Sequence, residues 1–547
     1  MTPAMKLGSA ALLLSTTALT GHSALAATSC ADLAHIGLPD TVISIAQPVT
    51  GGSFTPPGSS RPLTGLPDFC RVAGSIRPTS DSDIEFELWM PLAGWNGKFN
   101  GVGNGGLAGT ISYSAMAPSL QRGYATASTD TGHTNAGGPG FFALGHPEKI
   151  IDFGYRGHHE LAVKSEAIVA AFYGRQTAHN YYTGCSQGGQ EGMMEAQRFP
   201  DDYDGLVIGD PDNFMTHHEV GAHLWITAAL LGDPASYISA SQAAIIGNAV
   251  DAACDARDGV TDGVLNDPRT CHFPADKLAC KKGQDPSTCL TDAQVEAVEK
   301  IWSGPDHVVG PGYDPGIERG GETLGWPGFI TGNAPGNGSH TSLGIPFFRY
   351  FIYDDPNWDF HTFNFKTDAP FVSNKLVVPG QTMAHVLDAA DPNLEPLKQR
   401  GGKIIHYHGF SDPDIAPRNS INYFLSVVGA EAESAGPRKA LAETQEFYRL
   451  FMVPGMNHCG GGPGANSFDT LTALENWVEH GQAPARIIAS HSTGGAVDFT
   501  RPLCPYPQIA RWTGTGSTSD AANFVCTAEA GNHGDVGVAL NQGKGHD

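Results

Sequence analysis

A serine beside one cysteine and a histidine beside another are the residues of this chain best suited to chemistry. Residues 183–189 read TGCSQGG, which contains the pattern Gly-x-Ser-x-Gly. This run follows a short β-prone segment, 180–182, and precedes a helix-compatible segment, 190–198. A strand, this turn and a helix form a nucleophile elbow, in which a strained serine stands clear of a sheet. Ser186 is therefore the candidate nucleophile, and the dipole of the following helix favours negative charge beside it.

The candidate base and acid lie far along the chain, each just after a predicted strand. His458 lies in the run Pro-Gly-Met-Asn-His-Cys, and Asp412 and Asp414 follow another strand. The chain order serine, acid, histidine is that of the α/β-hydrolase triad. Asp412 is preferred to Asp414 because it lies nearer the end of its strand. His458 would take the proton of Ser186, and Asp412 would hold the imidazole in the correct tautomer.

A glycine-rich loop supplies candidates for an oxyanion hole. It ends the run 98–106, which begins as a predicted strand, and contains Gly105 and Gly106. In esterase sheets, such a loop brings backbone N–H groups to the substrate carbonyl, and a second donor is the N–H after the nucleophile. That second donor is here Gln187. A flexible surface turn is the alternative for the loop, as a Gly-rich turn is for the short serine pattern.

Alternating strands and helices position these residues. Strands are predicted over 85–90, at the start of 98–106, and over 123–129, 205–211, 403–408 and 448–453. Helices are predicted over 161–172, 190–198 and 468–479. Such alternation predicts an α/β fold with a mostly parallel sheet. The first part of this core is expected over 27–212 and the second part over 391–547.

Between the two parts of the core, residues 213–390 differ in character and predict an inserted lid domain. One helix, over 295–302, is indicated by a capping box of Thr291 and Gln294. Residues 303–345 read as a Gly- and Pro-rich loop, and nine aromatic residues crowd into 347–365. Most of these aromatic side chains are expected to form the core of the lid, and a few to line an aromatic-binding cleft.

A calcium loop is expected within the lid, between Cys254 and Cys271. Three acids at short spacing, with glycines for tight bends, suit a hard cation, and Ca²⁺ takes about six to eight oxygen ligands that include backbone carbonyls. The expected ligands are the carboxylates of Asp255, Asp258 and Asp262 and the carbonyls of Val260 and Val264. A solvated acidic turn is the alternative. The ion would be structural, because the loop carries no group that activates water.

Composition and the N-terminus predict an exported protein. The net charge of -24 argues against nucleic acid or an anionic membrane surface as a partner. Residues 1–26 have the order of a signal peptide: the basic Lys6, a moderately apolar segment over 7–20, and the small-x-small cleavage site at 24–26. We find no other apolar run long enough for a membrane span. The mature protein is expected to be secreted or periplasmic.

The cysteine count also indicates an oxidising compartment. An even number of cysteines behind an export signal implies disulfides, although the sequence leaves their pairing open. The ten cysteines are Cys30, Cys70, Cys185, Cys254, Cys271, Cys280, Cys289, Cys459, Cys504 and Cys526. Cys30 lies close to the mature N-terminus, so a lipid anchor on its sulfur is an alternative to a disulfide. Residues 27–29 form a poor lipobox.

Over most of the mature chain, the sequence closely resembles the tannase/feruloyl esterase family. The mark of this family is a cysteine directly before the catalytic serine and another directly after the catalytic histidine, joined to each other; here these are Cys185 and Cys459. Gly409-x-x-Asp412 matches the aspartate of the family, and the spacing of the acidic loop matches the calcium site in its lid. The resemblance implies the pairs Cys30–Cys70, Cys185–Cys459, Cys254–Cys271, Cys280–Cys289 and Cys504–Cys526.

The resemblance implies a secreted serine esterase that acts on small aromatic carboxylic esters through an acyl-enzyme on Ser186. Feruloyl and related hydroxycinnamoyl esters are the first choice. Galloyl esters and mono(2-hydroxyethyl) terephthalate are alternatives, since the family includes hydrolases of the latter. Ile415 is expected to face the substrate. Arg349 is a lid candidate for binding the terephthalate carboxylate, and a surface salt bridge is the preferred alternative for it. Alternatives from other classes are a non-catalytic, calcium-stabilised binding protein and a peptidase on the same scaffold.

Overall fold

The computed structural model of the protein describes Met1 and residues 27–528. The predicted signal peptide, 1–26, therefore lies outside the described residues apart from Met1, as does the end of the predicted second core segment, 529–547. None of the described helices is both long and apolar enough to cross a membrane.

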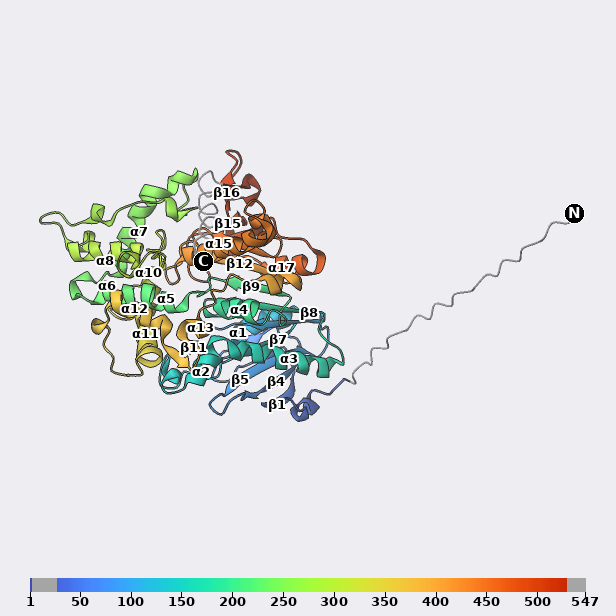
Figure 1. Ribbon diagram of the computed structural model, residues 1–547. Coiled ribbons are helices and arrows are strands. Elements are labelled where there is room, and N and C mark those ends of the chain that lie inside the picture. The colour runs from blue at the N-terminus through green and yellow to red at the C-terminus, as the bar shows by residue number, and fades with distance from the viewer. Residues whose placement is uncertain (2–26, 529–547) are drawn as a thin grey trace.

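A nine-stranded sheet forms the centre of the molecule (Figure 1). In spatial order its strands are β1 (Thr41–Val49), β4 (Phe69–Ile76), β5 (Ile84–Pro91), β7 (Ala125–Thr129), β6 (Lys98–Val102), β8 (His179–Cys185), β9 (Gly205–Gly209), β12 (Lys403–Gly409) and β13 (Tyr448–Val453). Pairing is parallel from β7 through β13 in this order and antiparallel from β1 through β7. The predicted α/β class with a mostly parallel sheet is confirmed.

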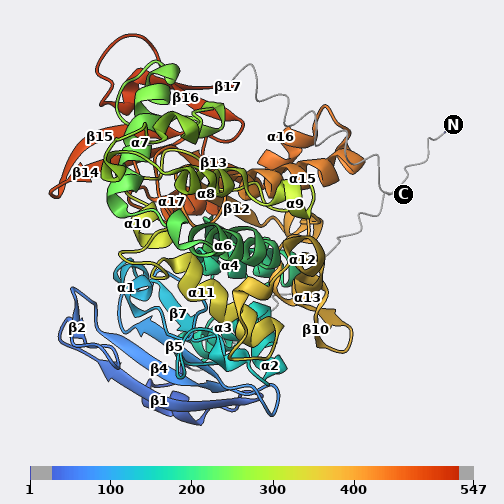
Figure 2. The same ribbon diagram turned by 90° about the vertical axis from the view of Figure 1, so that its left-hand side faces the viewer.

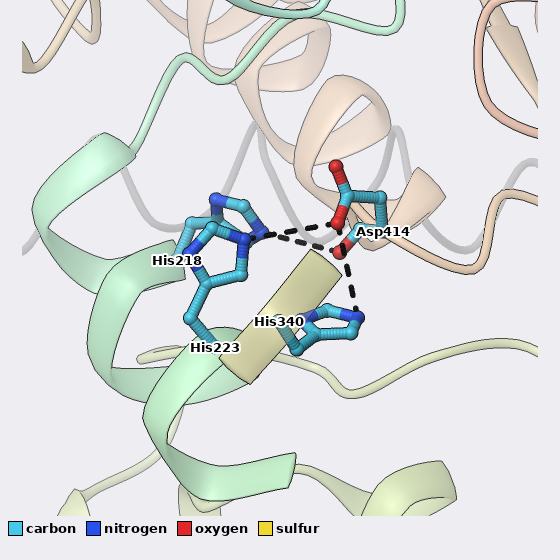
Figure 3. Close-up of side chains that lie close together, drawn as sticks. All are labelled: His218, His223, His340 and Asp414. Atoms are coloured by element: carbon cyan, nitrogen blue, oxygen red, sulfur yellow. Dashed lines mark hydrogen bonds and ion pairs between the residues drawn. The ribbon is translucent and has the colours of Figure 1, made fainter. Parts of the chain in front are cut away.

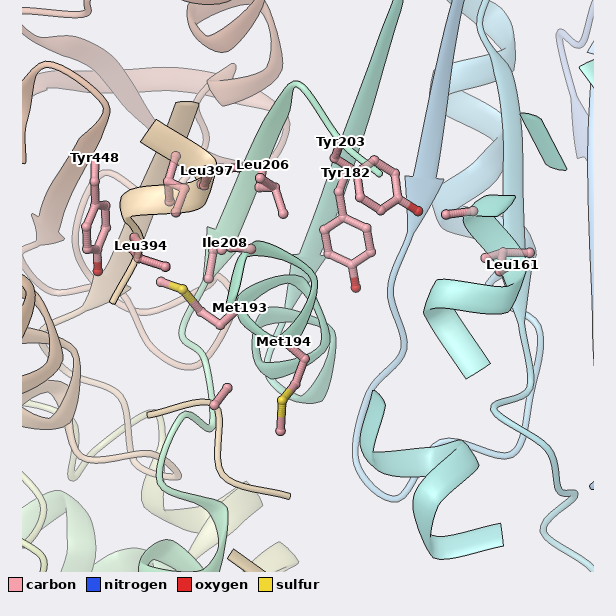
Figure 4. Packing of buried hydrophobic residues seen from close by; sticks show 14 of the residues in the cluster. Leu161, Tyr182, Met193, Met194, Tyr203, Leu206, Ile208, Leu394, Leu397 and Tyr448 are labelled. Atoms are coloured by element: carbon pink, nitrogen blue, oxygen red, sulfur yellow. The ribbon is translucent and has the colours of Figure 1, made fainter. Parts of the chain in front are cut away.

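Helices cover both faces of the sheet because successive strand residues point to opposite sides. Tyr182 of β8 belongs to one buried cluster with Met193 and Met194 (Figure 4). Its neighbour Tyr181 belongs to another buried cluster, with Leu474 and Trp477. One face carries α3 (Gly157–Tyr173), α4 (Gln187–Arg198) and α15 (Pro417–Ala435), and the other carries α1 (Tyr113–Gln121) and α17 (Thr470–His480). Buried apolar residues on both faces hold the strand ends that carry the candidate site.

The described chain between β9 and α14 (Glu395–Gln399) adds no strand to this sheet, and its helices gather on one side of it (Figures 1 and 2). These helices are α5 (Met215–His218), α6 (Trp225–Leu231), α7 (Ala240–Cys254), α8 (Asp292–Ser303), α9 (Asp306–Val309), α10 (Trp326–Phe329), α11 (Ser339–Phe347), α12 (Phe365–Asn374) and α13 (Met383–Leu387). A hairpin of β10 (Leu376–Val378) and β11 (Gln381–Thr382) accompanies them. This is the segment in which the lid is expected.

The predicted capping box is present at α8, but the lid is more helical than predicted. The Thr291 side chain accepts the Gln294 N–H, and the Gln294 side chain accepts the Thr291 N–H. The prediction that 303–345 is a loop is wrong, since the segment contains α9, α10 and the start of α11. These short helices have little intrinsic stability, and tertiary burial supplies it. Trp326 of α10 and Phe347 of α11, for example, are fully buried.

The aromatic stretch after residue 346 forms a core, as predicted for most of its members. Phe347 and Phe351 stack with ring centroids 4.8 Å apart, and Phe351 also contacts Phe142 and Phe153 of the first core segment. Aromatic packing therefore anchors the expected lid segment to the core. Each aromatic pair typically contributes about 0.5–1.5 kcal/mol to stability, in addition to the contribution from buried area.

The remaining elements lie at the two ends of the sheet and on its flanks. They are α2 (Pro147–Ile151), α14 (Glu395–Gln399), α16 (Ala440–Gln445), β2 (Ser53–Phe54), β3 (Leu63–Thr64), β14 (Ile487–Thr493), β15 (Ala496–Leu503), β16 (Gln508–Trp512) and β17 (Phe524–Ala528). The strands β14 to β17 form two antiparallel pairs. Figure 2 shows them at the end of the molecule opposite β1.

All five disulfides implied by the family resemblance are present. The bonded pairs are Cys30–Cys70, Cys185–Cys459, Cys254–Cys271, Cys280–Cys289 and Cys504–Cys526. Because the sulfur of Cys30 is in a disulfide, it is not free to carry a lipid.

Candidate active site

The turn from β8 to α4 has the geometry of a nucleophile elbow. Ser186 lies between these elements with φ 65° and ψ −126°, a backbone conformation that non-glycine residues rarely adopt. The flanking glycines permit the turn: a Cβ on Gly184 would lie 2.2 Å from the carbonyl oxygen of Gly188. A Cβ on Gly188 would lie 2.8 Å from the carbonyl oxygen of Asn104. The Gly-x-Ser-x-Gly pattern is thus required by close backbone approach on both sides of the serine.

Ser186, His458 and Asp412 form a continuous hydrogen-bonded chain. The Ser186 hydroxyl donates to Nε2 of His458 over 2.8 Å, and Nδ1 of His458 donates to Oδ2 of Asp412 over 2.7 Å. The three side chains come from the loops that follow β8, β13 and β12. A nucleophile bonded to a base, which is oriented by a third group, is the arrangement of a catalytic triad.

The carboxylate of Asp412 is held in place by its own neighbours. Its Oδ1 accepts the backbone N–H groups of Asp414 and Ile415, over 2.8 and 3.1 Å. His408 lies behind it, with Nε2 3.2 Å from Oδ2. Burial favours the neutral acid, but the charges and hydrogen bonds of His458 and His408 outweigh burial and lower the pKa of Asp412. Asp412 is therefore an anion positioned against the base.

Asp414, the competing candidate, lies on the other side of the imidazole. Its Oδ2 is 3.6 Å from Nε2 of His458, the nitrogen that accepts from the serine. Burial alone would lower the pKa of His458, but the negative charges of Asp412, Asp414 and Asp210 outweigh it and raise this pKa above its ordinary value. A base must be neutral to accept a proton, so kcat/KM is expected to rise with pH on the alkaline side of the ordinary histidine range.

The disulfide next to the triad joins the serine and histidine loops directly. Cys185 and Cys459 have Cα atoms 6.0 Å apart. Asp210, which is fully buried, braces the same place: its Oδ2 accepts the Cys459 N–H over 3.2 Å and its Oδ1 accepts the Gly409 N–H over 2.7 Å. The loops after β8, β9, β12 and β13 are thus linked around the nucleophile and the base.

We expect loss of this disulfide to impair both stability and activity. Cys185→Ala with Cys459→Ala should lower the free energy of unfolding by about 2–5 kcal/mol. Misplacement of His458 relative to Ser186 should lower kcat roughly 100-fold. Denaturant unfolding and steady-state kinetics measure the two effects.

The matched control is Cys280→Ala with Cys289→Ala, which removes a lid disulfide of sequence separation 9. Kinetics of this control should resemble those of the wild type. Full activity in the Cys185/Cys459 double variant would contradict the positioning role of its disulfide.

Two of the three predicted oxyanion donors border a hollow at Ser186. Gln187 is the first residue of α4, so the helix does not use its N–H. Gly106 borders the same hollow from the glycine-rich loop and has φ 56°. The loop is fixed to the elbow because the Gly188 N–H donates to the Asn104 carbonyl over 2.9 Å. Gly105 does not line the hollow, which leaves Gly106 as the better-placed partner of Gln187.

The hollow combines apolar and ionisable side chains. Its lining consists of Gly106, Leu107, Ser186, Gln187, Asp212, Met215, His218, Glu219, His223, Leu343, Asp414 and Ile415. Ile415, the predicted substrate contact, is among them. The described lining contains none of the aromatic residues of 347–365, so the expectation that a few of them line the cleft is not met in this hollow.

Sequence reasoning missed the polar side of this hollow. His218 and His223 lie five positions apart around the π-helical turn Glu219–Leu224, and both face the pocket together with Glu219. The run of residues 217–223, HHEVGAH, was the available signal. The spacing of the histidines in this run matches neither an α-helix nor a strand. A π-helical turn contains one more residue than an α-helical turn, and this brings positions five apart onto one face.

The predicted calcium ligands lie in one tight loop. Asp255 accepts the N–H groups of Asp262 and Gly263, over 3.2 and 3.1 Å, and Asp258 accepts the Val260 N–H over 2.9 Å. Four of the five predicted ligands, all except Asp255, border one hollow. Burial and the neighbouring acids raise the pKa of Asp258 to about 6. Clustered, partly desolvated oxygen donors of this kind fit a hard cation. The fit is not complete, because Asp262 also pairs with Arg501 over 2.6 Å.

Comparisons with known proteins point to one family. A family model described as "Tannase and feruloyl esterase" matches residues 70–527. An uncharacterized esterase of Xanthomonas campestris pv. campestris is 41% identical over 92% of each chain. A mono(2-hydroxyethyl) terephthalate hydrolase of Piscinibacter sakaiensis is 34% identical over 85% of each chain. The crystal structure of feruloyl esterase B from Aspergillus oryzae superimposes with a TM-score of 0.80 at 28% identity, covering 91% of this chain and 99% of that one.

Proposed function

Because this chain belongs to the tannase and feruloyl esterase family, we propose that it is an exported serine esterase that hydrolyses aromatic carboxylic esters. Feruloyl and related hydroxycinnamoyl esters are the proposed substrates. The observation that carries the proposal is the Ser186–His458–Asp412 hydrogen-bonded chain, which opens on a hollow with an apolar side and a polar side.

The geometry supports acyl transfer in two steps. His458 takes the Ser186 proton on Nε2 while the serine oxygen attacks the ester carbonyl carbon. Backbone N–H groups of Gln187 and Gly106 hold the oxyanion of the tetrahedral intermediate, and loss of one such donor typically costs about 10²–10³ in rate. His458 then returns the proton to the departing alcohol. Water attacks the acyl-enzyme in the reverse sequence and releases the free aromatic acid.

The lining of the hollow favours a neutral aromatic acyl group. Leu107, Met215, Leu343 and Ile415 supply apolar contacts for a ring, and the histidines and carboxylates supply partners for phenolic hydroxyls. Among the residues that the structure describes, no lysine or arginine lines this hollow. Arg349, the predicted partner of a terephthalate carboxylate, donates instead to the backbone carbonyl of Trp358 over 3.2 Å. This disfavours mono(2-hydroxyethyl) terephthalate, despite the named relative.

Galloyl esters are the second candidate, and one observation favours them. Asp212, Glu219 and Asp414 face the same hollow as His218 and His223. Together they could bind several phenolic hydroxyls, as a galloyl group requires. No observation specifically favours a peptidase. A non-catalytic binding protein would not require the complete Ser186–His458–Asp412 triad.

The decisive experiment compares hydrolysis of methyl ferulate, methyl gallate and mono(2-hydroxyethyl) terephthalate by oxidised, calcium-saturated protein. We expect the highest kcat/KM for methyl ferulate and the lowest for the terephthalate monoester. A higher value for methyl gallate would replace the proposed substrate with the second candidate. Absence of hydrolysis of all three esters, with cleavage of casein or a peptide, would favour the peptidase.

We also propose that the loop 255–264 binds a structural Ca²⁺. The carboxylates of Asp255, Asp258 and Asp262 and the carbonyls of Val260 and Val264 would hold it. Ion binding would compensate the mutual repulsion that contributes to the raised pKa of Asp258. The positive φ values of Gly259 and Gly263, 93° and 75°, let the loop bend around such a centre. The ion would stabilise the lid and take no part in the reaction.

Calcium removal should lower stability. At a free concentration about 100 times its dissociation constant, an ion that binds only the folded state contributes about 2.7 kcal/mol. We therefore expect a chelator to lower the Tm of the wild type. Without chelator, Asp258→Ala should already have the low Tm of the chelator-treated wild type. Adding the chelator should not lower its Tm further. The exposed Asp276→Ala serves as control and should respond like the wild type; an equal chelator response in Asp258→Ala would contradict the site.

Export is the proposed localisation. It is supported by the five disulfides, since such bonds form and persist in oxidising compartments. Detection of the mature protein outside the cytoplasm, with all cysteines oxidised, would be the expected result.

A further inference from the structure

Three imidazole rings and a carboxylate converge beside the catalytic base, on the lid side of the hollow (Figure 3). They belong to His218 of α5, His223 of the π-helical turn, His340 of α11 and Asp414 of the loop after β12. One nitrogen of each ring and one carboxylate oxygen all lie within 4.8 Å of one another, and all four residues are buried. We name these four residues the histidine cluster. The mechanism described above does not use the three histidines.

Two of the rings are oriented as metal ligands usually are. Nδ1 of His218 donates to Oδ2 of Asp212 over 3.0 Å, and Nδ1 of His223 donates to Oε2 of Glu219 over 2.9 Å. These bonds turn both Nε2 atoms toward Asp414: that of His218 is 3.1 Å from its carbonyl oxygen, and that of His223 is 3.7 Å from its Oδ1. A carboxylate that accepts from the outer ring nitrogen is a recurring support of metal-bound histidine.

The centre of the cluster holds polar atoms that the described residues leave unsatisfied. Nε2 of His223 and Oδ1 of Asp414 face each other, are buried and have no hydrogen-bond partner among the described residues. A buried polar group without a partner is energetically unfavourable. A nitrogen and an oxygen that face each other at 3.7 Å are too far apart for a hydrogen bond, but both can bind one ion placed between them.

Three carboxylates lie beside the rings. Asp212, Glu219 and Asp414 face the same hollow, and no lysine or arginine of the described chain lines it. Imidazole nitrogens with one carboxylate oxygen suit Zn²⁺ and similar borderline metals, whereas Ca²⁺ prefers oxygen alone. The donor set therefore differs in kind from that of the lid loop.

We propose that His218, His223, His340 and Asp414 form a second metal site, selective for Zn²⁺ or a similar divalent transition metal, and that its occupation inhibits the esterase. Asp414 joins the site to the catalytic machinery, because its other oxygen lies 3.6 Å from Nε2 of His458. The ligands His218, His223 and Asp414 line the hollow at Ser186, so a bound ion would obstruct the acyl group.

Binding requires protons to move. Nε2 of His218 donates to the Asp414 carbonyl and would release its proton to the solvent, because Nδ1 of the same ring keeps a proton. Nε2 of His340 donates to the Pro413 carbonyl over 2.9 Å, so this ring would move its proton to Nδ1 and direct the lone pair of Nε2 at the ion. Metal affinity should therefore rise with pH, as for other sites with histidine ligands.

The test is direct titration of the full, calcium-saturated protein with Zn²⁺ by isothermal calorimetry, and with Co²⁺ by visible absorption. We expect about one ion per chain and a tetrahedral Co²⁺ spectrum. His223→Gln and His340→Gln should each weaken Zn²⁺ binding at least tenfold and abolish that spectrum. Glu219→Gln, which removes only an outer support, should weaken binding roughly 10- to 100-fold. The exposed His361→Gln is the matched control and should bind like the wild type.

Inhibition is measured in parallel on the preferred ester. Hydrolysis by the wild type should fall as Zn²⁺ saturates the site and should recover with a zinc-selective chelator in excess calcium. Ser186→Ala is expected to be inactive but should still bind Zn²⁺ in the calorimetric titration. The metal site can therefore be tested even if the proposed esterase reaction is wrong. Absence of Zn²⁺ binding by the wild type would overturn the proposal. Unchanged affinity in correctly folded Glu219→Gln and His223→Gln would do the same, because the ion would then bind elsewhere.

Discussion

Ser186→Ala is expected to lower kcat roughly 10⁴- to 10⁶-fold on the preferred aromatic ester, because it removes the atom that forms the acyl-enzyme. The backbone N–H groups of Gln187 and Gly106 and the hollow remain, so residual hydrolysis by water should persist above the uncatalysed rate. Steady-state kinetics with at least a tenfold range of substrate would separate kcat from KM. We expect KM to change much less than kcat, since the hydroxyl is a small part of the binding surface.

Covalent labelling gives an independent check on the same residue. A fluorophosphonate should label the wild type at Ser186 and leave Ser186→Ala unlabelled. The exposed Ser241→Ala should label and turn over like the wild type. Substantial turnover by Ser186→Ala would rule out the elbow serine as nucleophile and would reopen the binding-protein and peptidase alternatives for this scaffold.

Asp412→Asn is expected to lower kcat roughly 10⁴-fold, as an amide at this position of a triad favours the wrong imidazole tautomer. The amide can also keep only part of the support that His408 and the Asp414 and Ile415 N–H groups now give the carboxylate. Asp414→Asn is the matched control, because it removes a carboxylate of the same loop that does not contact Nδ1. Asp414→Asn should lower kcat far less than Asp412→Asn. A larger loss in Asp414→Asn would assign the triad carboxylate to Asp414 instead of Asp412.

The same pair of variants separates the two acids by pH dependence. Asp414 is one of the negative charges that raise the pKa of His458. When this charge is removed, the protonated imidazole is less stable and the pKa of His458 falls. Because the neutral imidazole is the active form, the acidic limb of kcat/KM should shift to lower pH in Asp414→Asn. A shift to higher pH, or none, would contradict the proximity of Asp414 to the base.

Interactions local in sequence account for most of what could be predicted without the structure. The Gly-x-Ser-x-Gly pattern predicts the elbow because Gly184 and Gly188 are required within a few residues of Ser186. The capping box at Thr291 lies within four residues and was likewise predicted correctly. Parallel strands such as β9 were predicted because a strand buried on both faces is a continuous apolar run. The disulfide pairs followed from family resemblance, since cysteine positions alone leave the pairing open.

Predictions failed where a residue depends on partners distant in the chain. The segment 303–345 was read as a loop, because the burial that stabilises its short helices comes from other parts of the lid. The histidine cluster joins residues that are up to 196 positions apart, as the contact of His218 with the Asp414 carbonyl shows. No local pattern connects them.

By itself, the sequence indicated the α/β class, the candidates Ser186 and His458, the competing acids Asp412 and Asp414, and the acidic loop of the expected lid. Each of these depends on backbone geometry within a few residues or on a motif that the spacing of residues in the sequence reveals. Only the tertiary structure decided that Gly106 rather than Gly105 borders the hollow, that Asp412 contacts Nδ1 while Asp414 lies near Nε2, and that three histidines meet at Asp414. The physical reason is that these side chains meet only when the lid packs against the ends of the strands. That packing depends on many weak contacts between residues far apart in the chain, and such contacts produce no periodic pattern in the sequence.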